Sequence, residues 1–261
     1  MQSLNGKRAL VCGSTQGIGH ASAVALAAAG ASVVLLARNP ERLAAAHAAL
    51  PAPGGAAHET LVADLSDPAA LRATLARYLA SHPALHILVN NTGGPPPGLA
   101  LDATETAFLA AFTGHLLAGH ALVQCLVPGM REAGFGRIVN IVSTSVREPI
   151  RGLGVSNTIR AAVAGWAKTL SRELAPSGIT VNNILPGSTR TGRLESLIAS
   201  RAAAPGGSIE SVERAMQAEI PMGRFAEPRE IAAAVAFLAS PDAGYITGVS
   251  LPVDGGRLAS I

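Results

Sequence analysis

The sequence predicts a single α/β domain in which a parallel sheet carries helices on both faces. Its 261 residues fit one large domain of this class. Short runs rich in Val, Ile and Leu alternate with longer Ala-rich segments, as in successive strand–helix–strand units. The strand-like runs are continuously apolar, which is typical of strands buried on both faces. These three observations favour a doubly wound parallel sheet.

Seven runs have the length and composition of strands. In chain order they cover residues 8–12, 32–36, 59–63, 87–90, 138–142, 180–184 and 249–253. Three of the helices between them carry start signals, because Asn39, Asp67 and Glu227 each precede a proline that suits the first helical position. A long Ala-rich helix is expected to begin at Gly154.

The segment 188–221 differs from the rest of the chain. It carries Gly192, Pro205, Gly206 and Gly207 between polar and helical patches. We expect this segment to form a mobile flap over the substrate.

Composition excludes several classes of protein. Apolar residues make up 49% of the chain and charged residues 14%, so a sizeable core is expected. The net charge of +3 comes without any block of Lys or Arg, which argues against a nucleic-acid partner. The longest apolar run, 21–37, is interrupted and shorter than the roughly 20 residues of a membrane span, so no span is expected.

The two cysteines and the N-terminal sequence bear on location. Cys12 and Cys125 lie in apolar surroundings without metal-ligand spacing, which predicts a reduced protein with neither disulfide nor zinc site. The first residues pass directly into a strand-like run and do not resemble a secretion signal. A cytoplasmic location is expected.

A glycine-rich turn follows the first predicted strand. The sequence GSTQGIG covers Gly13, Ser14, Thr15, Gln16, Gly17, Ile18 and Gly19 and leads directly into a helix. Such a turn lets backbone N–H groups and a helix N-terminus meet a pyrophosphate. The spacing G-x-x-x-G-x-G departs from the commoner dinucleotide fingerprint, and a purely structural turn is the alternative.

The end of the second predicted strand indicates which dinucleotide is preferred. Many NAD-binding proteins place an acid here for the ribose hydroxyls, whereas this chain has Arg38. An arginine can pair with a 2′-phosphate, so NADP(H) is favoured over NAD(H), although Arg38 could also be a solvated residue at a helix start. Asp64, followed by Leu65, could accept from an adenine amino group, or could instead cap the next helix.

The chain resembles the classical short-chain dehydrogenase/reductase family over nearly its whole length. The resemblance is carried by GSTQGIG at 13–19, NNTG at 90–93, IVNIVS ending at Ser143, LPGSTRT at 185–191 and YITGVSLPVDGG at 245–256. It is nearest to proteins similar to 3-oxoacyl-[acyl-carrier-protein] reductases, including a subgroup with an imperfect catalytic tetrad. The resemblance implies a Rossmann-type seven-stranded sheet, a nicotinamide cofactor across the carboxyl ends of the strands, and a homotetramer.

The resemblance also assigns cofactor contacts. It places the pyrophosphate at Gly13, Gly17, Ile18 and Gly19 and the adenine at Asp64 and Leu65. The remaining implied contacts are Asn90 and Gly93 along the groove, with Pro186, Gly187 and Thr191 on the nicotinamide side.

The family's catalytic tetrad of Asn, Ser, Tyr and Lys is only partly present. Ser143 stands at the Ser position, but Ser156 replaces the Tyr and Arg160 replaces the Lys. His115 stands at the Asn position. Hydride transfer to a carbonyl leaves negative charge on oxygen, so the site needs a proton donor and a polarising hydrogen bond there. A Ser hydroxyl is far less acidic than the Tyr phenol, so Ser156 is a poor general acid.

Arg160 retains the positive charge of the missing Lys and could still hold ribose hydroxyls. His115, whose ordinary pKa is about 6.5, could protonate the substrate oxygen directly or through water, or could simply make a structural hydrogen bond. The substrate could instead bring its own acidic group. Arg193 and Arg201 could meet an anionic substrate or lie on a solvated helix face.

Two functions follow from these residues. The first is an NADP(H)-dependent oxidoreductase that acts on a carbonyl or secondary alcohol of a small molecule, such as a 3-oxoacyl thioester. The second is a catalytically degenerate protein that binds NADP(H) as a sensor or as the partner of a related enzyme.

Overall fold

The computed structural model describes residues 3–203 and 207–260. It contains one seven-stranded parallel sheet, as predicted, and the structure shows the strand order to be β3-β2-β1-β4-β5-β6-β7. The chain winds outward from β1 in one direction and from β4 in the other, so the strand order reverses between them. The strands are β1 Arg8–Cys12, β2 Ser32–Ala37, β3 Glu59–Val62, β4 Ile87–Asn90, β5 Gly136–Ile141, β6 Ile179–Pro186 and β7 Ser250–Val253.

The strand boundaries differ from the predicted ones mainly at β5 and β6. β5 begins two residues earlier, at Gly136, and β6 continues to Pro186. Pairing explains both differences. Gly136 is paired with Ile179 of β6, and Pro186 is paired with Val253 of β7, so neighbouring strands hold residues that lack strand-like side chains.

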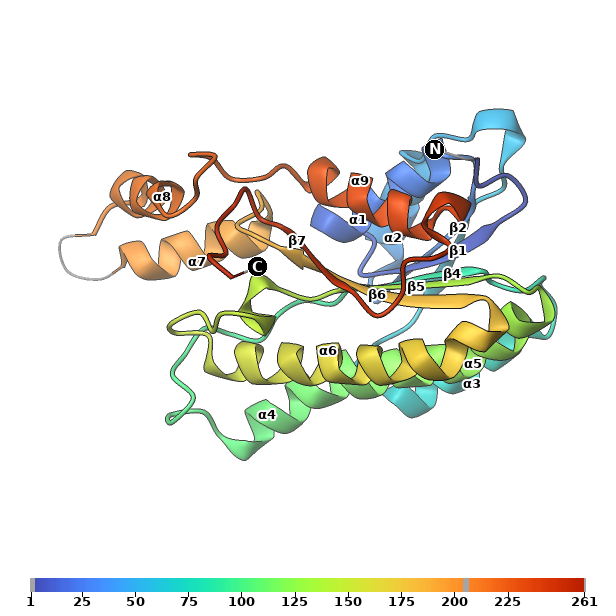
Figure 1. Cartoon of the computed structure of the whole chain (residues 1–261), viewed down its shortest axis with the longest axis horizontal. Helices are drawn as coiled ribbons and strands as arrows, with labels where there is room; N and C mark the ends of the chain where they lie inside the picture. The colour runs from blue at the N-terminus through green and yellow to red at the C-terminus, as the bar shows by residue number, and fades with distance from the viewer. Residues whose placement is uncertain (1–2, 204–206, 261) are drawn as a thin grey trace.

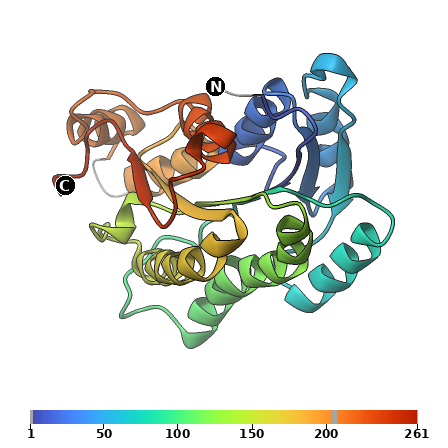
Figure 2. The ribbon, with the colours of Figure 1, turned by 45° about the vertical axis from the view of Figure 1, so that its right-hand side comes forward.

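Helices cover both faces of the sheet, as Figures 1 and 2 show. One apolar core lies between the sheet and α1 (Gly17–Ala28), α2 (Pro40–Ala48) and α9 (Pro228–Ala239). The other lies beneath α3 (Pro68–Leu79), α5 (Ala118–Glu132) and α6 (Gly154–Leu174). The strands are buried on both faces, which accounts for their continuous apolarity.

The three predicted helix starts are confirmed. Asn39 accepts a hydrogen bond from the Arg42 N–H, and Asp67 accepts from the amides of the first turn of α3. The Glu227 N–H donates to Glu230 at the start of α9. Since Asp67 caps α3, the alternative that Asp64 does so is wrong.

Segment 188–221 contains two helices, α7 (Gly192–Ala202) and α8 (Ile209–Ala218). They share a small apolar cluster made by Leu194, Ile198, Met216, Ile220 and Phe225. Pro205 and Gly206 lie outside the described residues, and the mobility of the flap remains a prediction.

A long helical segment extends over Glu105–Glu132. It consists of α4 (Glu105–Phe112), the π-turn η2 (Thr113–Leu117) and α5. By length and composition alone this one segment is apolar enough to cross a membrane, with a mean hydropathy of 1.4. Its α5 part, however, buries an apolar side against the sheet, and a core helix of a water-soluble protein has the same composition.

Both cysteines are free thiols. Cys12 is buried at the end of β1, and burial raises its pKa to about 12. The structure therefore shows a packing residue there.

Candidate active site

A cleft of about 720 Å³ lies over the carboxyl ends of the strands. Parallel α/β sheets bind ligands at this edge, where the strand order reverses. The cleft collects most of the predicted site residues from segments far apart in the chain. They are Gly13, Thr15, Gln16, Gly17, Ile18, Arg38, Asp64, Leu65, Gly93, Ser143, Ser156, Arg160, Pro186, Gly187 and Thr191.

Four predicted residues do not line this cleft. Ser14 is fully buried, and its hydroxyl donates to the Leu36 carbonyl. Gly19 supports the turn from within the helix. Asn90 and His115 line a smaller adjoining cavity.

The turn between β1 and α1 has the geometry of an anion site. Gly13 and Gly17 both have a φ of +57°, which disfavours any other residue. A Cβ on Gly19 would lie 2.2 Å from the Gly13 carbonyl oxygen, so only glycine allows this close approach. Gln16, at the N-cap of α1, makes no side-chain hydrogen bond to the first turn, and no acid lies in that turn. The amides of α1 are thus left for an anion, and the turn fits a dinucleotide diphosphate.

The far end of the cleft is basic. Arg38 Nη1 lies 3.9 Å from Asp64 Oδ2, and its side chain is 75% exposed. The Ser66 N–H bonded to Asp64, with a smaller contribution from Arg38, lowers the pKa of Asp64. Arg42, in the first turn of α2, also lines the cleft. Two guanidiniums therefore border the region where a 2′-phosphate would lie.

Ser143, Ser156 and Arg160 all line the cleft. Arg160 donates from Nε to Ser156 Oγ at 3.2 Å, and the Ser145 N–H donates to Ser143 Oγ at 3.1 Å. Each serine oxygen already accepts a hydrogen bond from the protein. Each hydroxyl proton is therefore left to donate to a ligand oxygen.

Arg160 also supplies a hydrogen-bond donor that the sheet itself lacks. The Val142 N–H donates to the Ile184 carbonyl, and in a parallel ladder the Val142 carbonyl would then accept from the residue two positions further along, Pro186. Proline has no N–H to donate. Arg160 Nη1 supplies the missing donor, at 2.6 Å from the Val142 carbonyl and 3.1 Å from the Ile141 carbonyl. The guanidinium is thereby fixed beside Ser156.

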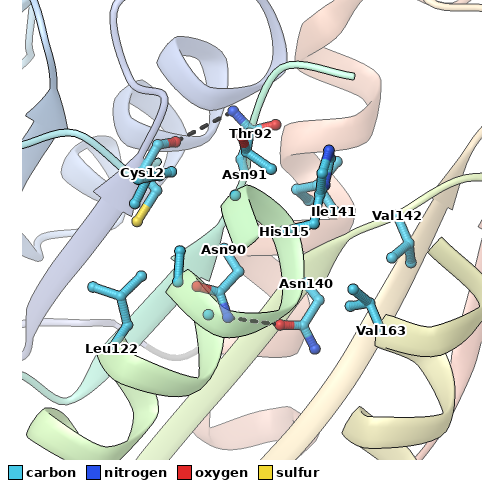
Figure 3. Close-up of a pocket in the computed structure, with 14 residues that line it drawn as sticks. Cys12, Asn90, Asn91, Thr92, His115, Leu122, Asn140, Ile141, Val142 and Val163 are labelled. Atoms are coloured by element: carbon cyan, nitrogen blue, oxygen red, sulfur yellow. Dashed lines mark hydrogen bonds between the residues drawn. The ribbon is translucent and has the colours of Figure 1, made fainter. Parts of the chain in front are cut away.

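His115 lies in the π-turn that interrupts the long helix, a feature frequent at functional sites. Figure 3 shows it in the small cavity, between Asn91, Asn140 and Ile141. Burial and the charge of Arg160 lower the pKa of His115 to about 3. Its hydrogen bond with the Gly93 backbone raises the pKa, but by less. A pKa this low leaves the ring uncharged at neutral pH, which argues against His115 as a general acid, and its catalytic role stays a prediction. The hydrogen bond with Gly93 favours the structural alternative.

A chain of buried amides underlies the site. Asn90 Nδ2 donates to Asn140 Oδ1 at 2.8 Å (Figure 3), and Asn140 Nδ2 donates to Asn183 Oδ1 at 2.9 Å. Asn90 thus joins β4 to β5 below the cleft, where the sequence predicted a cofactor contact.

Comparisons with known proteins show which family the chain belongs to. Residues 13–257 match the family model described as enoyl-(acyl carrier protein) reductase. The chain is 35% identical over 257 residues to an uncharacterized oxidoreductase of Mycobacterium tuberculosis, covering 98% of this chain and 94% of that protein. It is 34% identical to the 3-oxoacyl-[acyl-carrier-protein] reductase of Haemophilus influenzae, covering 98% of this chain and all of that protein.

The chain belongs to the short-chain dehydrogenase/reductase family. Among solved structures, it is similar to the L-sorbose reductase of Gluconobacter frateurii complexed with NADPH and L-sorbose, with a TM-score of 0.93 and 31% identity. That match covers 100% of this chain and 99% of the other. Family membership confirms the resemblance drawn from the motifs.

Sequence reasoning missed two residues of this short-chain dehydrogenase/reductase site. Arg42 lies in the first turn of α2, just after the predicted helix start at Asn39, and its closeness to Arg38 in the chain was a usable signal. Asn91 donates from Nδ2 to the carbonyls of Cys12 and Gly13, at 3.2 and 3.3 Å, and so ties the glycine-rich turn to β4. Nothing in the spacing of Asn91 distinguishes it from its neighbour Asn90.

Proposed function

We propose that this short-chain dehydrogenase/reductase is an NADP(H)-dependent oxidoreductase that interconverts a carbonyl and a secondary alcohol on a small molecule. One observation carries the proposal. A turn that fits a dinucleotide diphosphate and a pair of serine hydroxyls beside a fixed guanidinium line the same cleft. The proposed cofactor contacts are those predicted from the sequence that line the cleft, with Asn90 and Gly19 supporting them from below.

The cofactor preference rests on charge. Arg38 and Arg42 border the adenosine end, and Asp64 is held beside Arg38. A 2′-phosphate would be attracted by both guanidiniums, whereas a ribose 2′-hydroxyl would find no acid placed for it as in NAD-specific sites. The sorbose reductase structure, which holds NADPH, supports the same preference.

The chemistry divides between cofactor and protein. When bound, the nicotinamide supplies or accepts a hydride at the substrate carbon. Ser143 and Ser156 donate their hydroxyl protons as hydrogen bonds to the substrate oxygen. Arg160 keeps its charge at neutral pH, because its pKa, lowered by burial and by Arg193, is still about 10. The guanidinium stabilises negative charge that develops on that oxygen.

No tyrosine is among the described residues that line the cleft, so no phenol there supplies the proton that completes the alcohol. Ser156 is a weak acid, and His115 is uncharged at neutral pH. We infer that the proton comes from water in the cleft, passed through the Ser156 hydroxyl. Loss of a positioned acid costs about 10²- to 10⁴-fold in rate, so a slow enzyme is expected.

The test combines binding and turnover. NADPH is titrated by its fluorescence, and reduction of 3-oxoacyl thioesters and small ketones is followed by its absorbance. Binding with slow reduction of at least one class supports the proposal, while absence of binding contradicts it. NADPH binding with no turnover would favour the sensor or partner protein.

A double variant, Ser156→Tyr with Arg160→Lys, serves as the comparison. If the native protein shows no reductase activity and the double variant is active, the catalytic role proposed for the native residues is wrong. Assembly into a tetramer and a cytoplasmic location remain predictions.

A further inference from the structure

Two arginines from different helices meet beside Gly94. Arg160 lies on α6, and Arg193 lies in the first turn of α7. A Cβ built on Gly94 would lie 3.4 Å from Arg160 Nη2 and 3.6 Å from both Nε and Nη2 of Arg193. Three guanidinium nitrogens therefore surround one point at the wall of the cleft, where glycine leaves space.

The two positive charges have no acid to balance them. Within the parts of the chain that the structure describes, neither Arg160 nor Arg193 makes an ion pair. Asp64 is the only acidic residue among the described residues that line the cleft, and it lies at the adenosine end beside Arg38. Burial lowers the pKa of Arg193, and burial together with Arg193 lowers that of Arg160. Positive charges that are partly desolvated and unpaired destabilise the folded protein, and a bound anion would remove that cost.

Both side chains are held in place by backbone oxygens. Arg193 Nη2 donates to the Pro95 carbonyl at 2.6 Å, and Arg160 is fixed by the carbonyls at the end of β5. The Arg193 Nε and the Arg160 Nη2 have no protein acceptor among the described residues. The arrangement is thus preorganised, with donors left over.

The position of the pair indicates which ligand it serves. The diphosphate of the cofactor has its own site at the glycine-rich turn of α1. The arginine pair instead adjoins Ser156, where Arg160 Nε lies 3.2 Å from the hydroxyl proposed to hold the substrate oxygen. An anion beside Gly94 would therefore belong to the substrate.

We infer that the substrate carries an anionic group, a carboxylate or phosphate ester, that binds Arg193 in the field of Arg160. A guanidinium presents its donors as a planar fork that matches both anions. This inference rests on the proposed function, because the substrate carbonyl is placed at Ser143 and Ser156. It narrows the substrate class from ketones in general to oxo acids and oxo phosphate esters.

The experiment compares charged compounds with matched neutral ones. The carboxylate arm uses 2-oxobutanoate, acetoacetate and 4-oxopentanoate against their methyl esters. The phosphate arm uses dihydroxyacetone phosphate against dihydroxyacetone. Each is titrated calorimetrically into the NADPH-loaded protein and assayed for reduction. At least one anion should bind about 10-fold or more tightly than its neutral partner, and the arm that contains it identifies the anion.

Arg193→Gln should remove this preference by raising KM, while Arg193→Lys should keep part of it. Arg214→Gln, on an exposed face of α8 and outside the lining of the cleft, is the matched control and should change nothing. Thermal melting verifies that each variant is folded. If Arg193→Gln does not fold, Arg193→Lys still tests whether the anion preference depends on this side chain.

Three outcomes would overturn the inference. The neutral compounds could bind as well as the anions, or none of the compounds could bind. Arg193→Gln could instead weaken NADPH as strongly as it weakens the anions, which would assign Arg193 to the cofactor diphosphate. NADPH titration of the native protein separates the two proposals. If the native protein does not bind NADPH, the proposed function is contradicted, whereas NADPH binding without a preference for anions contradicts only this inference.

Discussion

Arg160 donates from Nε to Ser156 Oγ at 3.2 Å, across one turn of α6. The same guanidinium holds the Val142 carbonyl, which faces the proline at the end of β6. One side chain thus completes the sheet ladder and orients the hydroxyl proposed to contact the substrate. We therefore expect stability and activity to be coupled at this position.

Arg160→Lys is expected to lower both the stability of the protein and its activity. An ammonium cannot reach Ser156 and two carbonyls with separate donors as the guanidinium fork does. A buried carbonyl left without a donor costs about 1–3 kcal/mol, which should appear as a lower free energy of unfolding in urea. Arg172→Lys, on an exposed face of α6, is the control and should leave the protein unchanged. Equal stability of the two variants would show that the Val142 contact contributes nothing.

Arg38→Gln should weaken the binding of NADPH without weakening the binding of NADH. Hydrogen bonds to a charged group contribute about 1.5–3 kcal/mol, so the NADPH dissociation constant should rise about 10- to 100-fold. Fluorescence titration with both cofactors measures the change. Arg190→Gln removes an exposed arginine paired with Glu227 elsewhere, and should alter neither constant. If Arg38→Gln weakened both cofactors alike, its role in selecting NADPH would be disproved.

Gly19→Ala should abolish cofactor binding or folding. The added methyl would lie 2.2 Å from the Gly13 oxygen and 2.6 Å from Asn91 Nδ2, so the glycine-rich turn would have to move. Gly165→Ala provides the control, since nothing lies within 4 Å of its Cβ position on α6 and Ala favours a helix by up to about 1 kcal/mol. Circular dichroism and NADPH titration of the pair separate folding from binding. Normal affinity in Gly19→Ala would refute this packing.

His115 should make stability depend on pH. Its folded pKa of about 3 is below the ordinary value of 6.5, so between these values the unfolded chain binds a proton that the folded chain does not. Its contribution to stability is therefore present above pH 6.5 and lost as the pH falls, by about 1.4 kcal/mol per unit at most. His115→Asn should show a correspondingly shallower decline below pH 6.5 in urea titrations. Identical slopes for the two proteins would mean that the pKa of His115 is not lowered by folding.

The sequence by itself determined the sheet and the glycine-rich turn between β1 and α1. Continuous apolar runs can be buried on both faces, and a glycine-rich turn between strand and helix predicts its own geometry from local sterics. The departures at positions 115, 156 and 160 were visible too, because the motifs around them fixed the register. These features depend on neighbours in the chain.

Only the tertiary structure decided what the departing residues contact. Arg160 reaches a carbonyl 18 residues away, and Arg193 donates to one 98 residues away. The lowered pKa of His115 likewise depends on burial and on a guanidinium from another helix. Hydrogen bonds and charge interactions act over a few ångströms in space, and sequence spacing carries no record of which distant segments the fold brings within that range.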